Sequence, residues 1–320
     1  MEKHGSGLSI GIVGAGAIGG FLAARLGAAG APITALARGA TLAALRQHGL
    51  YLSSGLGDVH LPSLRVSDDA GALGQPDIVI VAVKSQDTAA AAAAMAPMVG
   101  PHTWILSVQN GLTGGRVLTE RFGTDRLALG VTWVPATVEA PGRIRHTGPV
   151  RRVVFGPASP GAASDSLAAL AELGHRGGLE MELRPDPRPA IWEKLVVLAP
   201  FHGISALTRL PLGHWLSVPE TRALYANGMA EAAAVGRAEG VALPEDIVTR
   251  SLTFSEEVAD PATRASMLDD IEAGRALELD ASLGELVERG ARAGVPTPTL
   301  GLLRALLLPR RGGDPTGKRL

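Results

Sequence analysis

Three glycines near the start of the chain have the spacing of a phosphate-binding turn. The apolar residues 8–13 lead into Gly14-Ala15-Gly16-Ala17-Ile18-Gly19, and residues 21–26 continue as an apolar helical pattern. Gly14 would allow the tight turn, Gly16 a close approach of the backbone to a pyrophosphate, and Gly19 close packing of helix on strand. The pyrophosphate would then lie against free N–H groups of the helix. We predict dinucleotide binding by Gly14, Ala15, Gly16, Ala17, Ile18 and Gly19; the alternative is a glycine-rich turn that binds nothing.

A cationic residue follows the next apolar run, because residues 32–37 end at Arg38. A site for the non-phosphorylated cofactor places an acidic residue there, which accepts a hydrogen bond from the ribose 2′-hydroxyl. Arg38 instead presents a fork of donors suited to a phosphate, so the sequence predicts NADP (NADPH) as the cofactor. The alternative is a solvated surface arginine.

Lysine is rare in this chain. Of 30 basic residues, the lysines are Lys3, Lys84, Lys194 and Lys318, and the first and last lie near the ends. A chain that uses arginine for ordinary positive charge can keep lysine where a compact ammonium must give up a proton. Lys84 and Lys194 are therefore candidates for chemistry.

Composition narrows the class of protein. The chain has 320 residues, 46% hydrophobic content and a net charge of −1, which is typical of a soluble two-domain protein without nucleic acid partners. Cysteine is absent, which excludes disulfides and thiolate sites and fits a cytoplasmic protein. The eight histidines lack ligand spacing, so we expect no metal. A homodimer is left open.

The uncharged residues 8–24 resemble a signal peptide, but the run is rich in glycine and is explained by a strand, a turn and a helix. It is also slightly too short to span a bilayer. We expect no other segment to be long and apolar enough to cross a membrane, and hence no membrane partner.

Further strands and helices alternate through the first part of the chain, as a parallel sheet requires. Residues 77–83 predict a buried strand ending at Lys84, the alanine-rich residues 89–95 a crossover helix, and residues 104–108 the next strand, followed by Asn110. Ligands bind at the carboxyl ends of strands in open α/β sheets, which predicts Lys84 and Asn110 beside the cofactor. The alternatives are a solvated lysine and a simple Asn-Gly turn.

A proline-rich stretch at residues 184–189 follows short strands at 143–147 and 151–155 and one more helix and strand. We place a domain boundary there, with a Rossmann-type NADP-binding domain over residues 1–185 and a helical substrate domain over 186–320. In the second part, helices are predicted to begin at 186–189 and to span 223–239 and 281–293, the last closed by Gly294. The tail, residues 309–320, is predicted to be disordered.

Lys194 lies in an unusual helical segment. The surrounding positions are apolar nearly all round, as in a buried helix: Ile191, Trp192, Leu195, Val196, Val197, Leu198 and Ala199. A lysine there must be paired, reach a wet cavity or lower its pKa. Glu193 is adjacent in sequence and points elsewhere, so any carboxylate partner must come from another segment. A surface lysine with a buried stem is the alternative.

These residues resemble the ketopantoate reductase (2-dehydropantoate 2-reductase) family, from about Leu8 to the last helix. The resemblance rests on five motifs in order: the glycine turn; Lys84 after its strand; Gln109-Asn110-Gly111; Trp192-Glu193-Lys194-Leu195; and residues 266–271 followed by Glu278-Leu279-Asp280. It implies an α/β fold, with an N-terminal Rossmann-type domain, an all-helical C-terminal domain and an active site in the cleft between them.

The resemblance also implies an activity, the NADPH-dependent reduction of 2-dehydropantoate to (R)-pantoate in pantothenate biosynthesis. Lys194 would be the general acid that protonates the keto oxygen, and Glu278 would lie beside the cofactor ribose and the substrate. Asn110 and Ser266 would hold cofactor and substrate, with Ser266 reaching the substrate carboxylate. Read from the residues alone, Ser266 is also explained as a polar residue early in a helix, and Glu278 as a surface acid.

The chain departs from the family pattern in the expected substrate site. The family usually carries asparagines four and eight residues after the lysine, where this chain has Leu198 and His202. A third asparagine corresponds roughly to Leu212, and another, before Gly284, to Leu283. We therefore predict Leu198 and His202 at the substrate, where they cannot satisfy a substrate hydroxyl as amides do. His202 is equally well explained as a packed core histidine.

Two other functions stay open at this point. One is a different NADP-linked 2-keto or 3-hydroxy acid oxidoreductase, which the replaced asparagines favour. The other is a non-catalytic dinucleotide-sensing protein, which would bind the cofactor without turnover; a buried Lys194 argues against it.

Overall fold

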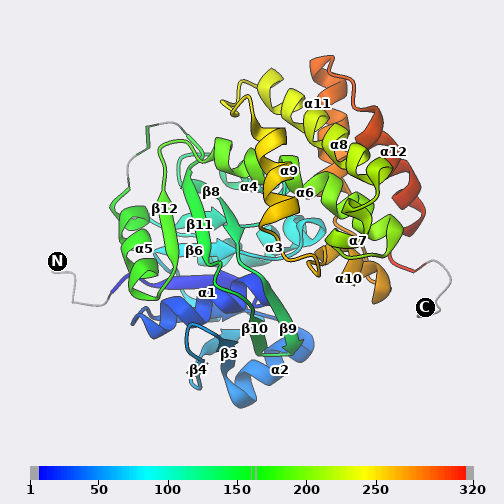
Figure 1. The fold of residues 1–320 in the computed structure, drawn as a ribbon. Coiled ribbons are helices and arrows are strands. Elements are labelled where there is room, and N and C mark those ends of the chain that lie inside the picture. Colours follow the sequence, from blue (N-terminus) through cyan, green and yellow to red (C-terminus); the bar gives the residue numbers. More distant parts are fainter. Residues whose placement is uncertain (1–6, 160, 163, 315–320) are drawn as a thin grey trace. The chain divides into compact units, whose positions relative to one another are not determined.

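The computed structural model describes residues 7–159, 161–162 and 164–314 (Figure 1). Among these residues the chain forms two compact units. The first unit comprises the described residues up to Gln109 together with Gly114–Pro187, and the second comprises Asn110–Thr113 and the residues from Arg188 onward. Lys3, Lys318 and the predicted disorder of residues 315–320 lie outside the described residues.

The first unit is built on an eight-stranded sheet with the order β12-β11-β8-β7-β6-β1-β2-β5. Its strands are β1 (Ile10–Val13), β2 (Ile33–Leu36), β5 (Arg65–Ser67), β6 (Ile78–Val81), β7 (Trp104–Ser107), β8 (Leu127–Trp133), β11 (Arg152–Pro157) and β12 (Glu180–Leu183). All neighbours are parallel except β8 and β11, which pair antiparallel. The predicted alternation of strands and helices is confirmed.

The alternation of side chains along the strands supplies a core to each face of this sheet. Ile10 and Ile12 join one apolar cluster with residues of α1 (Ala17–Ala28) and α5 (Asp165–Arg176). Val13 and Val79 join another with α3 (Thr88–Met95) and α4 (Thr113–Phe122). The remaining helical segments of this part are α2 (Gly39–His48), η1 (Ala70–Leu73), η2 (Ser85–Asp87) and η3 (Ala96–Met98).

A second, four-stranded sheet was not predicted. It has the order β4-β3-β10-β9, formed by β3 (Leu50–Ser54), β4 (Val59–Leu61), β9 (Ala136–Ala140) and β10 (Arg143–His146). The predicted strand at 143–147 thus pairs here, in parallel with β3 and antiparallel with β9. Strand β3 lies about 90 residues earlier in the chain, and no local pattern indicates a pairing over that separation.

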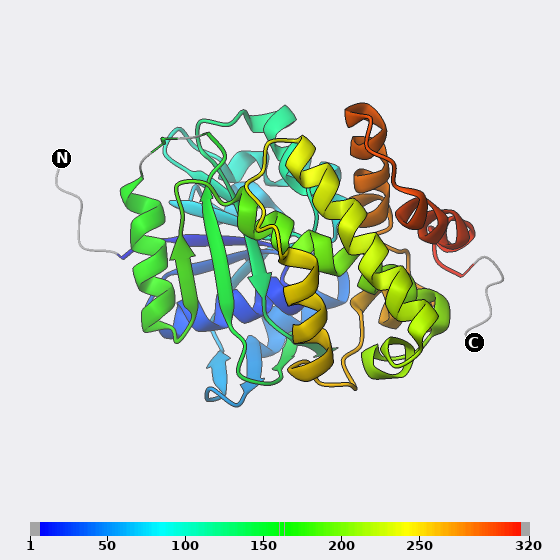
Figure 2. The same ribbon diagram turned by 45° about the horizontal axis from the view of Figure 1, so that its top comes forward.

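The second unit is helical in every described regular element (Figure 2). The elements are α6 (Arg188–Thr208), α7 (Leu212–Leu216), α8 (Pro219–Ala238), α9 (Ile247–Glu257), α10 (Ser266–Glu272), η4 (Asp280–Gly284), α11 (Glu285–Ala293), α12 (Pro298–Leu307) and η5 (Leu308–Arg310). Helix α6 packs against α8, α10 and α12. The predicted helical domain is confirmed.

The helix boundaries differ in two places. Helix α8 begins at Pro219, four residues before the predicted start, because proline is favoured in the first helical turn. The predicted helix 281–293 begins instead as the π-helical turn η4 and continues as α11, and Gly294 (φ 69°) ends it as predicted.

Two further expectations are corrected. Helix α6 is long and apolar enough to cross a membrane by length and composition, contrary to the sequence-based expectation. However, 67% of its 18-residue apolar stretch is buried inside the protein, as in the core helix of a globular unit. Residues 308–310 of the tail form η5, and the carbonyl of Arg311 accepts from the backbone N–H of Leu277 (3.0 Å). This part of the tail is therefore ordered.

Candidate active site

The glycine turn between β1 and α1 has the geometry that its sequence predicts. Gly14 has φ +93°, and a Cβ there would lie 2.7 Å from the Val83 side chain. A Cβ on Gly19 would lie 2.0 Å from the carbonyl oxygen of Gly14, so only glycine permits this contact of helix and turn. At Gly16 a Cβ would meet nothing within 4 Å, which leaves the backbone open to a ligand.

The first turn of α1 carries no acidic residue, and its N-cap, Gly16, supplies no side-chain cap. The N–H groups of this turn can therefore bind an anion.

A groove of about 210 Å³ adjoins this turn in the first unit. Its lining residues come from the end of β1 and the turn, from the ends of β2, β5 and β6, and from α2 and α3: Val13, Gly14, Ala15, Gly16, Leu36, Ala37, Arg38, Thr41, Asp68, Val83, Ala91 and Ala94. The groove therefore brings together Gly14, Ala15, Gly16 and Arg38. Ala17, Ile18 and Gly19 begin α1 and do not line the groove.

Arg38 is the exposed N-cap residue of α2, and no acidic residue occupies the first turn of that helix. Thr41 and Asp68 also line the groove, and sequence reasoning identified neither. Asp68 follows β5, which reaches β2 only through sheet pairing, and its carboxylate lies 3.3 Å from Arg46. Open backbone at the turn and a guanidinium at the end of β2 fit a dinucleotide that carries a 2′-phosphate.

Gln109 connects the ends of β6 and β7. Its side chain is buried, and Nε2 donates to the carbonyl of Val83 (2.9 Å) and to Thr88 Oγ1 (2.7 Å). Gln109 belongs to the motif Gln109-Asn110-Gly111, but its sequence context predicted no role for its side chain. The bridge thus holds together the two strand ends, and Lys84 and Asn110 are the residues that follow them in the chain. Lys84 itself is half-buried and does not line the groove.

Lys194 of α6 lies in the second unit, where Nζ donates to Asn110 Oδ1 (2.8 Å). Burial lowers the pKa of Lys194 to about 8, while the nearby carboxylate of Glu278 favours the charged form. Glu193 instead lies 4.0 Å from Arg250. The prediction that a carboxylate acting on Lys194 comes from another segment is confirmed.

His202 lies two turns further along α6 and is buried. Its Nε2 and Ser266 Oγ, the latter at the start of α10, lie 3.3 Å apart. Burial, and secondarily the charge of Lys194, lower the pKa of His202 to about 3, with Asp270 opposing. The ring is therefore neutral at pH 7, and its Nδ1 is buried without a hydrogen-bond partner among the described residues.

The positions of the replaced asparagines are apolar in the structure. Leu198 is half-buried on α6, one turn from Lys194, whereas Leu212 and Leu283 belong to the apolar core of the second unit. The second unit thus contains Lys194, Asn110, Glu278, His202 and Ser266. Among them, Lys194 contacts Asn110 and His202 contacts Ser266. The arrangement can hold a proton on an amine near neutral pH and offer it to a substrate.

Comparisons with known proteins agree across the chain. The profile described as "Ketopantoate reductase PanE/ApbA" matches residues 10–160, and "Ketopantoate reductase PanE/ApbA C terminal" matches residues 186–310. A 2-dehydropantoate 2-reductase of Mesorhizobium japonicum is 36% identical over 94% of this chain and 97% of its own.

Solved structures give the same result. The 2-dehydropantoate 2-reductase of Geobacter metallireducens has a TM-score of 0.88 at 31% identity, covering 94% of this chain and 99% of its own. A PanE/ApbA family ketopantoate reductase of Ralstonia eutropha has a TM-score of 0.86 at 31% identity, covering 95% and 98%. The resemblance found in the sequence motifs is thereby confirmed, and the chain belongs to the ketopantoate reductase family.

Proposed function

We propose that this protein is an NADPH-dependent 2-dehydropantoate 2-reductase, which reduces 2-dehydropantoate to (R)-pantoate in pantothenate biosynthesis. The observation that carries the proposal is the ammonium of Lys194, which donates to Asn110 and is poised by burial at a pKa of about 8. The full-length relatives named for this reaction support it. The chain has no cysteine and hence no disulfide, which fits an enzyme that acts in the reducing cytoplasm.

NADPH, when bound, supplies the hydride that forms the new C–H bond at the keto carbon. Gly14, Gly16 and Arg38 would hold the cofactor through its phosphates. As negative charge develops on the keto oxygen, Lys194 donates a proton from Nζ to that oxygen, which completes the hydroxyl group. Asn110 Oδ1 accepts a hydrogen bond from one of the three N–H groups of the ammonium, and this restricts the directions in which the other two can point.

The protonation state of Lys194 suits this role. With a pKa of about 8, the amine is mostly protonated at pH 7, yet it is a stronger acid than an ordinary lysine. Glu278 favours the ammonium form before the reaction. Ser266 would bind the substrate carboxylate through its hydroxyl, with Leu198 and His202 beside the rest of the substrate.

A second candidate is the reduction of a different 2-keto acid, or an NADP-linked 3-hydroxy acid oxidoreduction. Leu198 and the neutral, buried His202 favour it, because they replace amides that would pair with a substrate hydroxyl.

A panel of 2-keto acids tests these functions through the loss of NADPH absorbance. We expect 2-dehydropantoate to have the highest kcat/KM. A keto acid without the hydroxyl that exceeds it by about tenfold or more would favour the second candidate. NADPH binding without oxidation of the cofactor by any member would instead indicate a dinucleotide sensor.

A further inference from the structure

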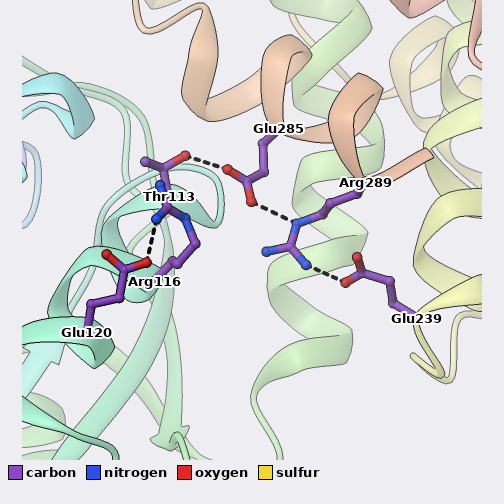
Figure 3. A network of polar contacts seen from close by, with 6 residues as sticks. All are labelled: Thr113, Arg116, Glu120, Glu239, Glu285 and Arg289. Carbon is purple, nitrogen blue, oxygen red and sulfur yellow. Dashed lines mark hydrogen bonds and ion pairs between the residues drawn. The ribbon is translucent and has the colours of Figure 1, made fainter. Parts of the chain in front are cut away.

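A line of charged and polar side chains crosses the second unit from Thr113 to Glu239 (Figure 3). Thr113 Oγ1 donates to Glu285 Oε2 (2.8 Å), and Arg289 Nε donates to the other oxygen, Oε1 (2.8 Å). Arg289 Nη1 in turn donates to Glu239 Oε2 (2.5 Å), at the end of α8. The mechanism above uses none of these four residues.

Glu285 is the central member of this network. Its side chain is only 8% exposed, and each carboxylate oxygen has a donor. A buried carboxylate is costly unless it is paired, and a charged acceptor with a donor on each oxygen has a fixed position. Arg289, one turn along α11, binds Oε1 and thereby holds in place the carboxylate whose other oxygen, Oε2, accepts the hydrogen bond from Thr113.

A second contact holds the short segment Asn110–Thr113, which ends at Thr113. Gly111 has φ +78°, and a Cβ there would lie 1.9 Å from the carbonyl oxygen of Ala281 in η4. The backbone at Gly111 therefore lies directly on the π-helical turn, and the bond from Thr113 to Glu285 attaches the same segment a second time.

The two attached segments carry the partners of Lys194. Asn110 lies three residues before Thr113, and Glu278 lies seven residues before Glu285. On α6 itself, His202 is coupled electrostatically to Lys194, and Glu193 faces Arg250. Charged side chains on the helices packed against α6 have other partners: Asp270 pairs with Arg275, Glu231 accepts from backbone N–H groups of α12, and Arg304 pairs with Glu288. The attachment therefore determines where Asn110 stands relative to Glu278.

We propose that Glu285, held by Arg289, is a positioning residue that fixes Thr113 and thereby keeps Asn110 Oδ1 at Lys194 Nζ. Its kinetic consequence rests on the proposed function, whereas its effect on the protonation of Lys194 does not. Without the attachment, the ammonium loses a hydrogen-bond acceptor that favours its charged form. The pKa of Lys194 should then fall below its native value of about 8, and less of the amine would be protonated at pH 7.

Thr113→Val removes the hydroxyl at nearly constant volume, Thr113→Ser retains it, and Glu285→Gln removes the charge that holds Arg289. Glu120→Gln is the matched control, since Glu120 pairs with Arg116 on the exposed face of α4 (Figure 3). The primary readout is NMR titration of the full chain labelled with [¹³Cε]lysine. The chain has four lysines, and Lys194→Arg assigns the signal of interest.

We expect Thr113→Val and Glu285→Gln to lower the measured pKa of Lys194 by about half a unit or more, as the loss of one acceptor for a charge predicts. Thr113→Ser should restore the native value, and Glu120→Gln should not change it. In turnover, the kcat of Thr113→Val should fall about tenfold. This is less than the roughly hundredfold loss expected when a catalytic group is fully misplaced. The Kd for NADPH should not change.

A double-mutant cycle distinguishes positioning from general destabilisation. If Thr113 acts through Asn110, the variant with Thr113→Val and Asn110→Ala should be no slower than Asn110→Ala alone. Additive effects would overturn the proposal, as would a native pKa for Lys194 in Thr113→Val. If the protein reduces no 2-keto acid, the proposed function fails, while the NMR titration still decides whether Glu285 positions Asn110.

Discussion

At the residue scale, opposing effects set the acidity of Lys194. Burial removes water from the ammonium and lowers its pKa, whereas Asn110 and Glu278 stabilise the charged form. The balance, at about 8, leaves a group that is protonated at neutral pH and can transfer its proton. An ordinary surface lysine would be charged as well, but a weaker acid.

Two substitutions of Lys194 separate proton transfer from electrostatics. Lys194→Ala should lower kcat by at least about a hundredfold at pH 7, because a positioned general acid contributes about 10² to 10⁴ in rate. Lys194→Arg keeps the charge but cannot readily give up a proton, so it should be similarly slow. Single-turnover rates and NADPH titration measure both. Retention of most of kcat in the arginine variant would mean that Lys194 is an electrostatic anchor and that another group supplies the proton.

Arg38 should select the phosphorylated cofactor. Arg38→Asp should weaken NADPH binding by roughly tenfold to a hundredfold, the loss of about 1.5 to 3 kcal/mol for a charge-assisted contact, and should spare NADH. Arg176→Asp, at the end of α5 and away from the groove lining, is the charge-matched control. Isothermal titration with both cofactors gives the comparison. Equal affinity of the native protein for NADPH and NADH would exclude a phosphate-binding role for Arg38.

At the scale of elements, α6 arranges the chemistry by its periodicity. Positions four and eight residues after Lys194 lie on roughly the same side of the helix and hold Leu198 and His202. The π-helical turn η4 serves a different purpose, because it receives the backbone at Gly111 and leads into Glu285. Turns of this type occur frequently at functional sites.

The side chains on α6 should determine affinity for a hydroxylated substrate. If Leu198 and His202 stand where amides would bind 2-dehydropantoate, the native protein should show a weak KM, and Leu198→Asn combined with His202→Asn should lower it by about tenfold or more. The Kd for NADPH should not change. A native KM in the low micromolar range would mean that other side chains bind the substrate hydroxyl.

At the scale of the whole molecule, each unit has its own apolar core residues. In the second unit, the buried side chain of His202 makes the free energy of unfolding depend on pH. His202 has a pKa of about 3 when folded and about 6.5 when exposed. Between these values the unfolded chain binds a proton that the folded chain excludes. The free energy of unfolding should therefore fall as the pH falls from about 6.5 towards 3, by at most about 1.4 kcal/mol per pH unit from this residue.

Denaturant unfolding between pH 7 and 4.5 measures this effect. The native protein should lose stability faster than His202→Gln as the pH falls, because the variant has no histidine to protonate at this position. The difference between the two curves isolates His202 from the carboxylates that titrate in the same range. Parallel curves would show that His202 has nearly the same pKa in the folded and unfolded states, which would contradict the prediction.

The sequence alone determined those features that depend on neighbouring residues. The glycine turn, the strands that follow it and the helix around Lys194 all appear as spacing and periodicity within one element, and ordered motifs identified the family. Helix α8 shows the limit of this reasoning even locally, since its start at Pro219 was missed.

Tertiary structure decided what depends on contacts between distant segments. Asn110 meets Lys194 across 84 residues and Thr113 meets Glu285 across 172, and β3 pairs with β10 although no local pattern links them. The acidity of Lys194 and the neutrality of His202 likewise arise from desolvation by residues packed around them. A periodic pattern reports which face of an element is apolar, but only the folded chain determines which side chains meet there and how much water they exclude.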